Sequence, residues 1–134
     1  MYKNIGKLHH IGLATEHLAE TTALYEKMGY EIGNVLDDPA QHVKVCFLTH
    51  PFNPTIEVII SAEKSSPIRT LLQKNGTCLY HLCYETENID AAVQELRKDG
   101  YLPVSKEKTS VISGGAKVMF LYHSEMCLIE LVEL

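Results

Sequence analysis

The chain has 134 residues, of which 46% are hydrophobic and 22% charged. This length and composition predict a single globular domain with a sizeable core. A formal net charge of −5 and the lack of any basic run argue against a nucleic-acid-binding surface. No apolar run approaches the ~18 residues of a membrane span and no signal pattern opens the chain, so we expect a cytoplasmic protein.

The first half of the chain predicts a strand, a helix and three further strands. Residues 7–15 are apolar around a histidine pair and too short for a typical helix. Residues 18–28 have the apolar spacing of a helix, and Gly29 ends it. The strands that follow are expected at 30–36, 43–50 and 55–61.

A short helix is expected between the halves, at 68–75, where Ser66 and Pro67 open it and Gly76 ends it. The second half then repeats the first. Residues 79–101 align without gaps onto 8–30 at an offset of 71. The later strands repeat at an offset of 73, where AKVMFLYH (116–123) matches VKVCFLTH (43–50) and LIELV (128–132) matches TIEVI (55–59). Internal repetition of this kind predicts two copies of one βαβββ module.

The helix of the second half carries the clearer signals. Asn88 is suited to cap it, and an apolar stripe at Ile89, Ala92 and Leu96 faces a core. Strands are expected at 102–106, 116–123 and 127–134. Cysteines in apolar strand-like stretches predict small core residues in a reducing compartment; these are Cys46, Cys83 and Cys127.

Four ionisable residues recur at matching places in the two halves, as His10 with His81 and Glu57 with Glu130. Seen alone, a strand histidine is usually a core or surface group and a strand glutamate usually faces water, and two plain His–Glu ion pairs are a further alternative. The repeat favours a shared site, because related modules can bring both pairs to one sheet-lined cleft. Two imidazoles and two carboxylates suit a divalent Mn, Fe, Co, Ni or Zn ion.

These residues belong to a pattern that resembles the vicinal oxygen chelate superfamily, which includes glyoxalase I, extradiol dioxygenases and bleomycin-resistance proteins. Within it, the chain is most similar to methylmalonyl-CoA epimerase. The motifs that carry the resemblance are HHIGLA (9–14), QHVKVCFL (41–48), SPI (66–68) with LLQKNG (71–76), YHLCYET (80–86) with NIDAAVQEL (88–96), MFLYH (119–123) and LIELVE (128–133).

The resemblance implies an α+β fold in which tandem βαβββ modules form a curved, barrel-like mixed sheet around a metal cleft. Module one would span about 5–62, the connecting helix about 66–76 and module two about 77–134, all in one domain. Superfamily members often dimerise, so a homodimer is expected.

The resemblance also implies a metal bound by His10, Glu57, His81 and Glu130, with Glu57 and Glu130 moving a proton beside a carbonyl. The main expectation is therefore a metal-dependent isomerase that epimerises a small acyl thioester such as a CoA thioester. A glyoxalase I-like lyase and a non-catalytic, small-molecule-binding resistance-type protein are the alternatives.

Two positions depart from the epimerase pattern. Some epimerases carry a further catalytic glutamate in the strand equivalent to 43–48, and the matching residue here is Val45, which cannot transfer a proton. The residue before the first ligand histidine is commonly aspartate, and here it is His9. The metal-site expectation is unaffected by either departure, whereas the first weakens the specific epimerase assignment.

Overall fold

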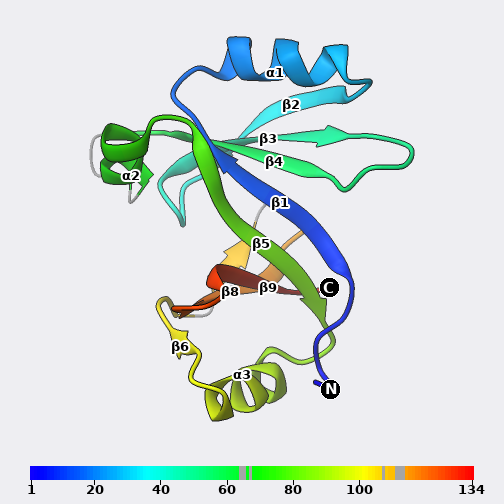
Figure 1. Cartoon of the computed structure of the whole chain (residues 1–134), viewed down its shortest axis with the longest axis vertical. Coiled ribbons are helices and arrows are strands. Elements are labelled where there is room, and N and C mark those ends of the chain that lie inside the picture. The colour runs from blue at the N-terminus through cyan, green and yellow to red at the C-terminus, as the bar shows by residue number, and fades with distance from the viewer. Residues whose placement is uncertain (64–65, 67, 107, 111–113) are drawn as a thin grey trace. The chain divides into compact units, whose positions relative to one another are not determined.

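The structure is a computed structural model that describes residues 1–63, 66, 68–106, 108–110 and 114–134 (Figure 1). It contains two compact units, which we name the first-repeat unit (His10–Tyr80) and the second-repeat unit (Met1–His9 with His81–Leu134). In chain order the elements are β1 (Leu8–Ala14), α1 (Leu18–Lys27), β2 (Glu31–Asp38), β3 (Val43–Thr49), β4 (Ile56–Ser61), α2 (Ile68–Asn75), β5 (Cys78–Thr86), α3 (Ile89–Lys98), β6 (Leu102–Pro103), β7 (Lys108–Ser110), β8 (Ala116–His123) and β9 (Cys127–Glu133).

The first-repeat unit has the strand order β2-β3-β4-β1, in which β1 and β4 are parallel and the other neighbours are antiparallel. Alternate side chains of these strands pack with Leu18 and Tyr25 of α1. That core includes Leu13 of β1, Leu48 of β3 and Val58 of β4. One face of the sheet is therefore covered by α1 (Figure 1).

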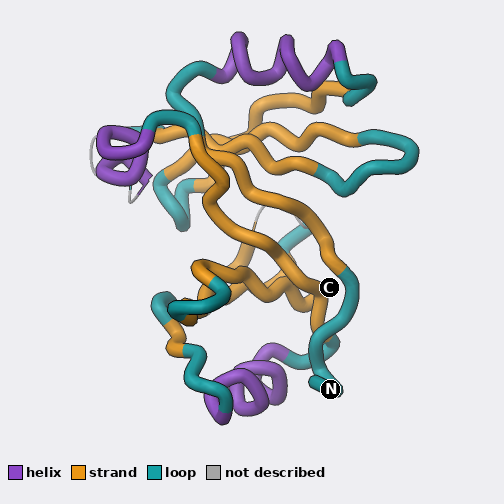
Figure 2. The backbone as a smooth tube through the Cα atoms, in the orientation of Figure 1, coloured by secondary structure: helices purple, strands orange, loops and turns teal. Residues whose placement is uncertain are grey.

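The second-repeat unit has the strand order β5-β9-β8-β6, with β5 and β9 parallel and β7 paired to β8. Its helix, α3, begins as expected at Asn88, whose side-chain oxygen accepts a 3.0 Å hydrogen bond from the Ala91 amide. Ile89 and Leu96 of α3 pack on Leu131 of β9 in a single buried cluster. The order strand, helix, strands is thus the same in both units (Figure 2).

The glycines after α1 and α3 mark the same turn in each repeat. Gly29 and Gly100 both have φ of +93°, a conformation that glycine adopts without strain. A Cβ atom on Gly29 would also lie only 3.1 Å from Nε2 of His50. The backbone conformation and the close contact therefore both favour glycine. The predicted end of α1 at this glycine is confirmed to within one residue.

The predicted α+β class and the repeated order of elements are confirmed, and 68–75 is helical as predicted. Pro67 lies outside the described residues. The predicted strand at 102–106 is wrong in extent, because β6 ends at Pro103 and Ser105 Oγ instead accepts the Phe120 amide at 3.0 Å. The prediction that Cys127 is a core residue is also wrong, since it is exposed at the start of β9 with φ of +59°.

Among the described residues, no helix is long and apolar enough to cross a membrane.

Candidate functional site

His10 and Glu57 form a buried pair in the first-repeat unit. Gly12 of β1 is the register partner of Glu57 in the parallel strand β4, and His10 lies two residues earlier on the same face of β1. Nε2 of His10 is 3.4 Å from Oε1 of Glu57, and the two residues are only 3% and 7% exposed. Their strand neighbours pack toward α1, so this pair lies on the sheet face that α1 does not cover.

His81 and Glu130 form the equivalent pair in the second-repeat unit. Cys83 of β5 is the register partner of Glu130 in β9, and His81 again lies two residues earlier. Nε2 of His81 is 3.3 Å from Oε1 of Glu130, with 5% and 4% of the residues exposed. The register of two parallel strands therefore produces the same imidazole–carboxylate geometry twice.

A carboxylate buried among isoleucine, valine and leucine costs several kcal/mol unless it has a polar partner. Each glutamate has such a partner in the histidine of its own unit. Imidazole nitrogens and carboxylate oxygens are also the atoms that bind transition metals in proteins. Both pairs can therefore serve either as structural ion pairs or as half of a metal-binding set.

Val45 occupies the position at which the epimerase pattern can have a further catalytic glutamate. It is 2% exposed and lies on β3 two residues before Phe47, which is the register partner of Glu57. The same position of the second repeat is Val118, which is also buried. Both repeats thus have a branched apolar side chain at this position of the strand next to the glutamate, and neither valine can carry a proton.

His50 and His123, which also repeat, have structural contacts. Nδ1 of His50 accepts hydrogen bonds from the amides of Phe52 and Asn53 at 3.1 Å each. Nδ1 of His123 accepts the Glu125 amide at 3.0 Å. Each ring therefore fixes the turn that follows its strand.

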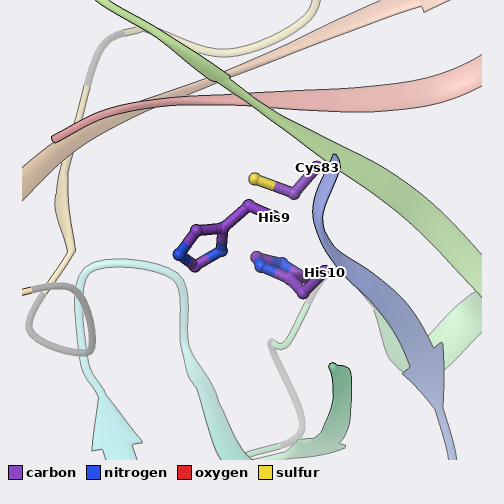
Figure 3. A group of neighbouring side chains, drawn as sticks. All are labelled: His9, His10 and Cys83. Atoms are coloured by element: carbon purple, nitrogen blue, oxygen red, sulfur yellow. The ribbon is translucent and has the colours of Figure 1, made fainter. Parts of the chain in front are cut away.

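The second-repeat unit contains two further side chains of kinds that can bind a metal, His9 and Cys83. Figure 3 shows them together with His10, the neighbour of His9 on β1. A ring nitrogen of His9 and Sγ of Cys83 lie within 4.8 Å of each other, and Cys83 is fully buried. From the sequence, Cys83 was predicted only as a core residue. Its position two residues after His81, on the same face of a strand, could have indicated that it lies near the histidines.

Comparison with known proteins gives the family. A family model described as the Glyoxalase/Bleomycin resistance protein/Dioxygenase superfamily matches residues 9–132. The chain belongs to this superfamily. It is 34% identical over 131 residues to ethylmalonyl-CoA/methylmalonyl-CoA epimerase of Cereibacter sphaeroides, a match that covers 95% of this chain and 97% of the relative.

Other relatives point the same way. The human mitochondrial methylmalonyl-CoA epimerase is 33% identical over 133 residues, which cover 98% of this chain and 74% of that protein. The crystal structure of methylmalonyl-CoA epimerase from Mycobacterium tuberculosis has the same fold, with a TM-score of 0.80 and 24% identity over 93% of this chain and 85% of that one. The resemblance to methylmalonyl-CoA epimerases that the motifs predicted is confirmed.

Within each unit, the histidine and the glutamate have the donor types and the spacing of two neighbouring ligands of a divalent metal. Two donor atoms that each lie about 2.1 Å from one ion are separated by about 3.0–3.4 Å in tetrahedral or octahedral geometry. The nitrogen–oxygen separations of 3.4 and 3.3 Å fall at the upper end of this range and lie beyond the usual hydrogen-bond range of about 2.7–3.2 Å. Both the donor types and their spacing within each unit therefore suit adjacent ligands of one ion.

Proposed function

We propose that this protein is a metal-dependent epimerase of methylmalonyl-CoA or a closely similar acyl-CoA thioester. The observation that carries the proposal is the buried His–Glu pair, which occurs twice in the same strand register. It occurs in a chain that is 34% and 33% identical to two epimerases over nearly its whole length. Those relatives favour epimerisation over the glyoxalase I-like and non-catalytic alternatives.

The proposed metal ligands are His10, Glu57, His81 and Glu130. This set of two nitrogen and two carboxylate donors suits Co, Mn, Ni, Zn or Fe and leaves room in an octahedral shell for substrate oxygens. The bound ion would supply Lewis-acid stabilisation of the negative charge that develops on the thioester oxygen as the neighbouring carbon loses its proton.

Glu57 and Glu130 are the proposed acid and base. Epimerisation removes the proton of the carbon between the two carbonyl groups and returns a proton to the opposite face of that carbon. Two carboxylates related by the internal repeat suit these opposed roles, because one repeat supplies each of them. In this proposal Val45 takes no part in proton transfer, and the burial of both carboxylates keeps competing water away.

Solvent exchange tests the proposal directly. In heavy water, metal-loaded protein is expected to introduce deuterium at the acidic carbon of methylmalonyl-CoA, whereas His10→Ala and His81→Ala are expected to lose this activity. His17→Ala is the matched control, because His17 is an exposed histidine whose side chain makes no cap hydrogen bond.

The opposite results are equally clear. No exchange with any of the five metals would refute the epimerase proposal. Turnover of the hemithioacetal of methylglyoxal and a thiol, without exchange into the CoA ester, would identify a glyoxalase I-like lyase instead.

A cytoplasmic location and a homodimer stay predictions. Analytical ultracentrifugation of the purified protein tests the homodimer. A homodimer would sediment with twice the 15.1 kDa mass of one chain.

A further inference from the structure

The chain contains three phenylalanines, and each packs at a steep angle against a histidine. The ring of Phe47 lies 5.6 Å from that of His10 at an interplanar angle of 76°. The ring of Phe120 lies 5.2 Å from that of His81 at 87°. These separations and angles are those of edge-to-face aromatic pairs.

Phe47 and Phe120 occupy equivalent places in the two repeats. Phe47 on β3 is the register partner of Glu57, and Phe120 on β8 is the register partner of Glu130. Each unit therefore contains a compact set of one histidine, one glutamate and one phenylalanine. In each set, the histidine touches both the carboxylate and the aromatic ring.

The aromatic contact adds to the polar contact in orienting each imidazole. The torsion that turns an imidazole about its bond to Cβ is broad and roughly two-fold, so each contact that the ring makes narrows its range of orientations. A phenyl ring packed edge-to-face favours one orientation, by an amount that corresponds to about a 2- to 12-fold population difference. In both units the ring packed against the phenylalanine has its Nε2 toward the glutamate, at 3.4 and 3.3 Å.

The third pair, Phe52 with His50, has a similar geometry outside the proposed site. The two rings are 5.9 Å apart at 61°, and Phe52 is 90% exposed. His50 is held in any case by the two amides that bind its Nδ1. This pair supplies a natural control for the loss of an aromatic ring beside a histidine.

We propose that Phe47 and Phe120 are positioning residues that orient His10 and His81 for metal binding. The inference rests on the proposed function, because it assigns these phenylalanines to the proposed metal ligands. It predicts that a branched apolar residue of similar bulk cannot replace either ring, although it would preserve the local packing.

The test compares Phe47→Leu, Phe120→Leu and the control Phe52→Leu by titration of metal-free protein with Co²⁺. We expect the first two to weaken Co²⁺ binding about 2- to 12-fold each, the effect of one lost edge-to-face contact, and the control to leave binding unchanged. The double variant is expected to bind Co²⁺ more weakly than either single variant. Phe47→Tyr keeps the ring and is expected to restore binding.

A second readout needs no metal. In NMR spectra of the metal-free protein, the imidazole signals of His10 should shift in Phe47→Leu, and those of His81 in Phe120→Leu, while circular dichroism stays that of the wild type. Unchanged imidazole signals, or wild-type Co²⁺ affinity in both folded variants, would overturn the inference. Failure of the wild-type protein itself to bind Co²⁺ would refute the proposed metal site with Co²⁺, and the NMR comparison would still decide whether the phenylalanines orient the rings.

Discussion

The two repeats keep the same central strands but support them differently. In both, a histidine on the first strand and a glutamate on the last lie in the same register, with nitrogen–oxygen separations of 3.4 and 3.3 Å. Around these strands, the helices and the edges of the sheets have diverged. The conserved part is the part that holds the ionisable pairs, which is why we place the function there.

The helices show the difference most clearly. α3 has an Asn88 cap and three buried residues, whereas α1 has no buried residue and no side-chain cap at His17. Residues 1–7 add contacts on the side of α3, including a 2.6 Å hydrogen bond from the Tyr2 hydroxyl to Asp99. The second-repeat unit is therefore built around a firmly docked helix, and the first-repeat unit depends more on its sheet.

The edge strands differ as well. β2 runs unbroken over eight residues beside β3, with a register shift between Ile32 and Val35. Its counterpart in the second repeat is divided into β6 and β7, which both pair with β8. Edge strands carry no residue of either pair, so their division leaves the geometry of the histidines and glutamates unchanged.

The largest expected effect is on catalysis, and it should be the same in both repeats. Glu57→Gln and Glu130→Gln are each expected to lower the rate of deuterium exchange by about 10²–10⁴-fold, because each removes a proton-transfer group. Rates measured by mass spectrometry of methylmalonyl-CoA would check this. A loss confined to one variant would break the functional equivalence of the two repeats.

The next effect tests the different docking of the helices. Leu96→Ala in α3 should lower the free energy of unfolding by about 2–5 kcal/mol, because it leaves a cavity where a side chain is 2% exposed. Leu24→Ala in α1, where the side chain is 63% exposed, should change it by about 0.5 kcal/mol or less. Urea denaturation measures both, and equal losses would contradict the comparison.

The cap of α3 gives a smaller effect with a matched control. Asn88→Ala should cost about 1 kcal/mol, since it removes the side-chain acceptor of the Ala91 amide. His17 occupies the same position before α1 and makes no such bond, so His17→Ala should be close to neutral. Denaturation midpoints of the two variants, compared with the wild type, decide this; an equal effect would show that the cap does not distinguish the helices.

The smallest effect depends on pH. The hydrogen bond to Asp99 raises the pKa of Tyr2 from 10.0 to about 12. Because the folded-state pKa is the higher one, the contact stabilises the fold below about pH 10, and this contribution is lost as the pH rises through about 12. Tyr2→Phe should therefore be less stable than the wild type at neutral pH, and the difference should shrink in alkaline solution. A difference that is independent of pH would argue against the Tyr2–Asp99 contact.

Much of this arrangement could be predicted from the sequence, because it follows local rules. Strand alternation and the internal repeat placed His10 and Glu57 correctly on their strands, and Asn88 was recognisable as a cap. The end of β6 at Pro103 could not be predicted, since it depends on the Ser105 hydroxyl accepting the Phe120 amide of β8. The pairing of Phe47 with His10 was equally hidden, because sequence alone does not give the register between β3 and β4.

Metal content is the most direct test of the central claim, which is that the two His–Glu pairs bind one ion together. Elemental analysis after equilibration with Co²⁺ should find about one ion per chain in the wild type and almost none in either His10→Ala or His81→Ala. Two ions per chain, or a full ion retained when the histidine of one repeat is removed, would show that the pairs act separately and would contradict the account.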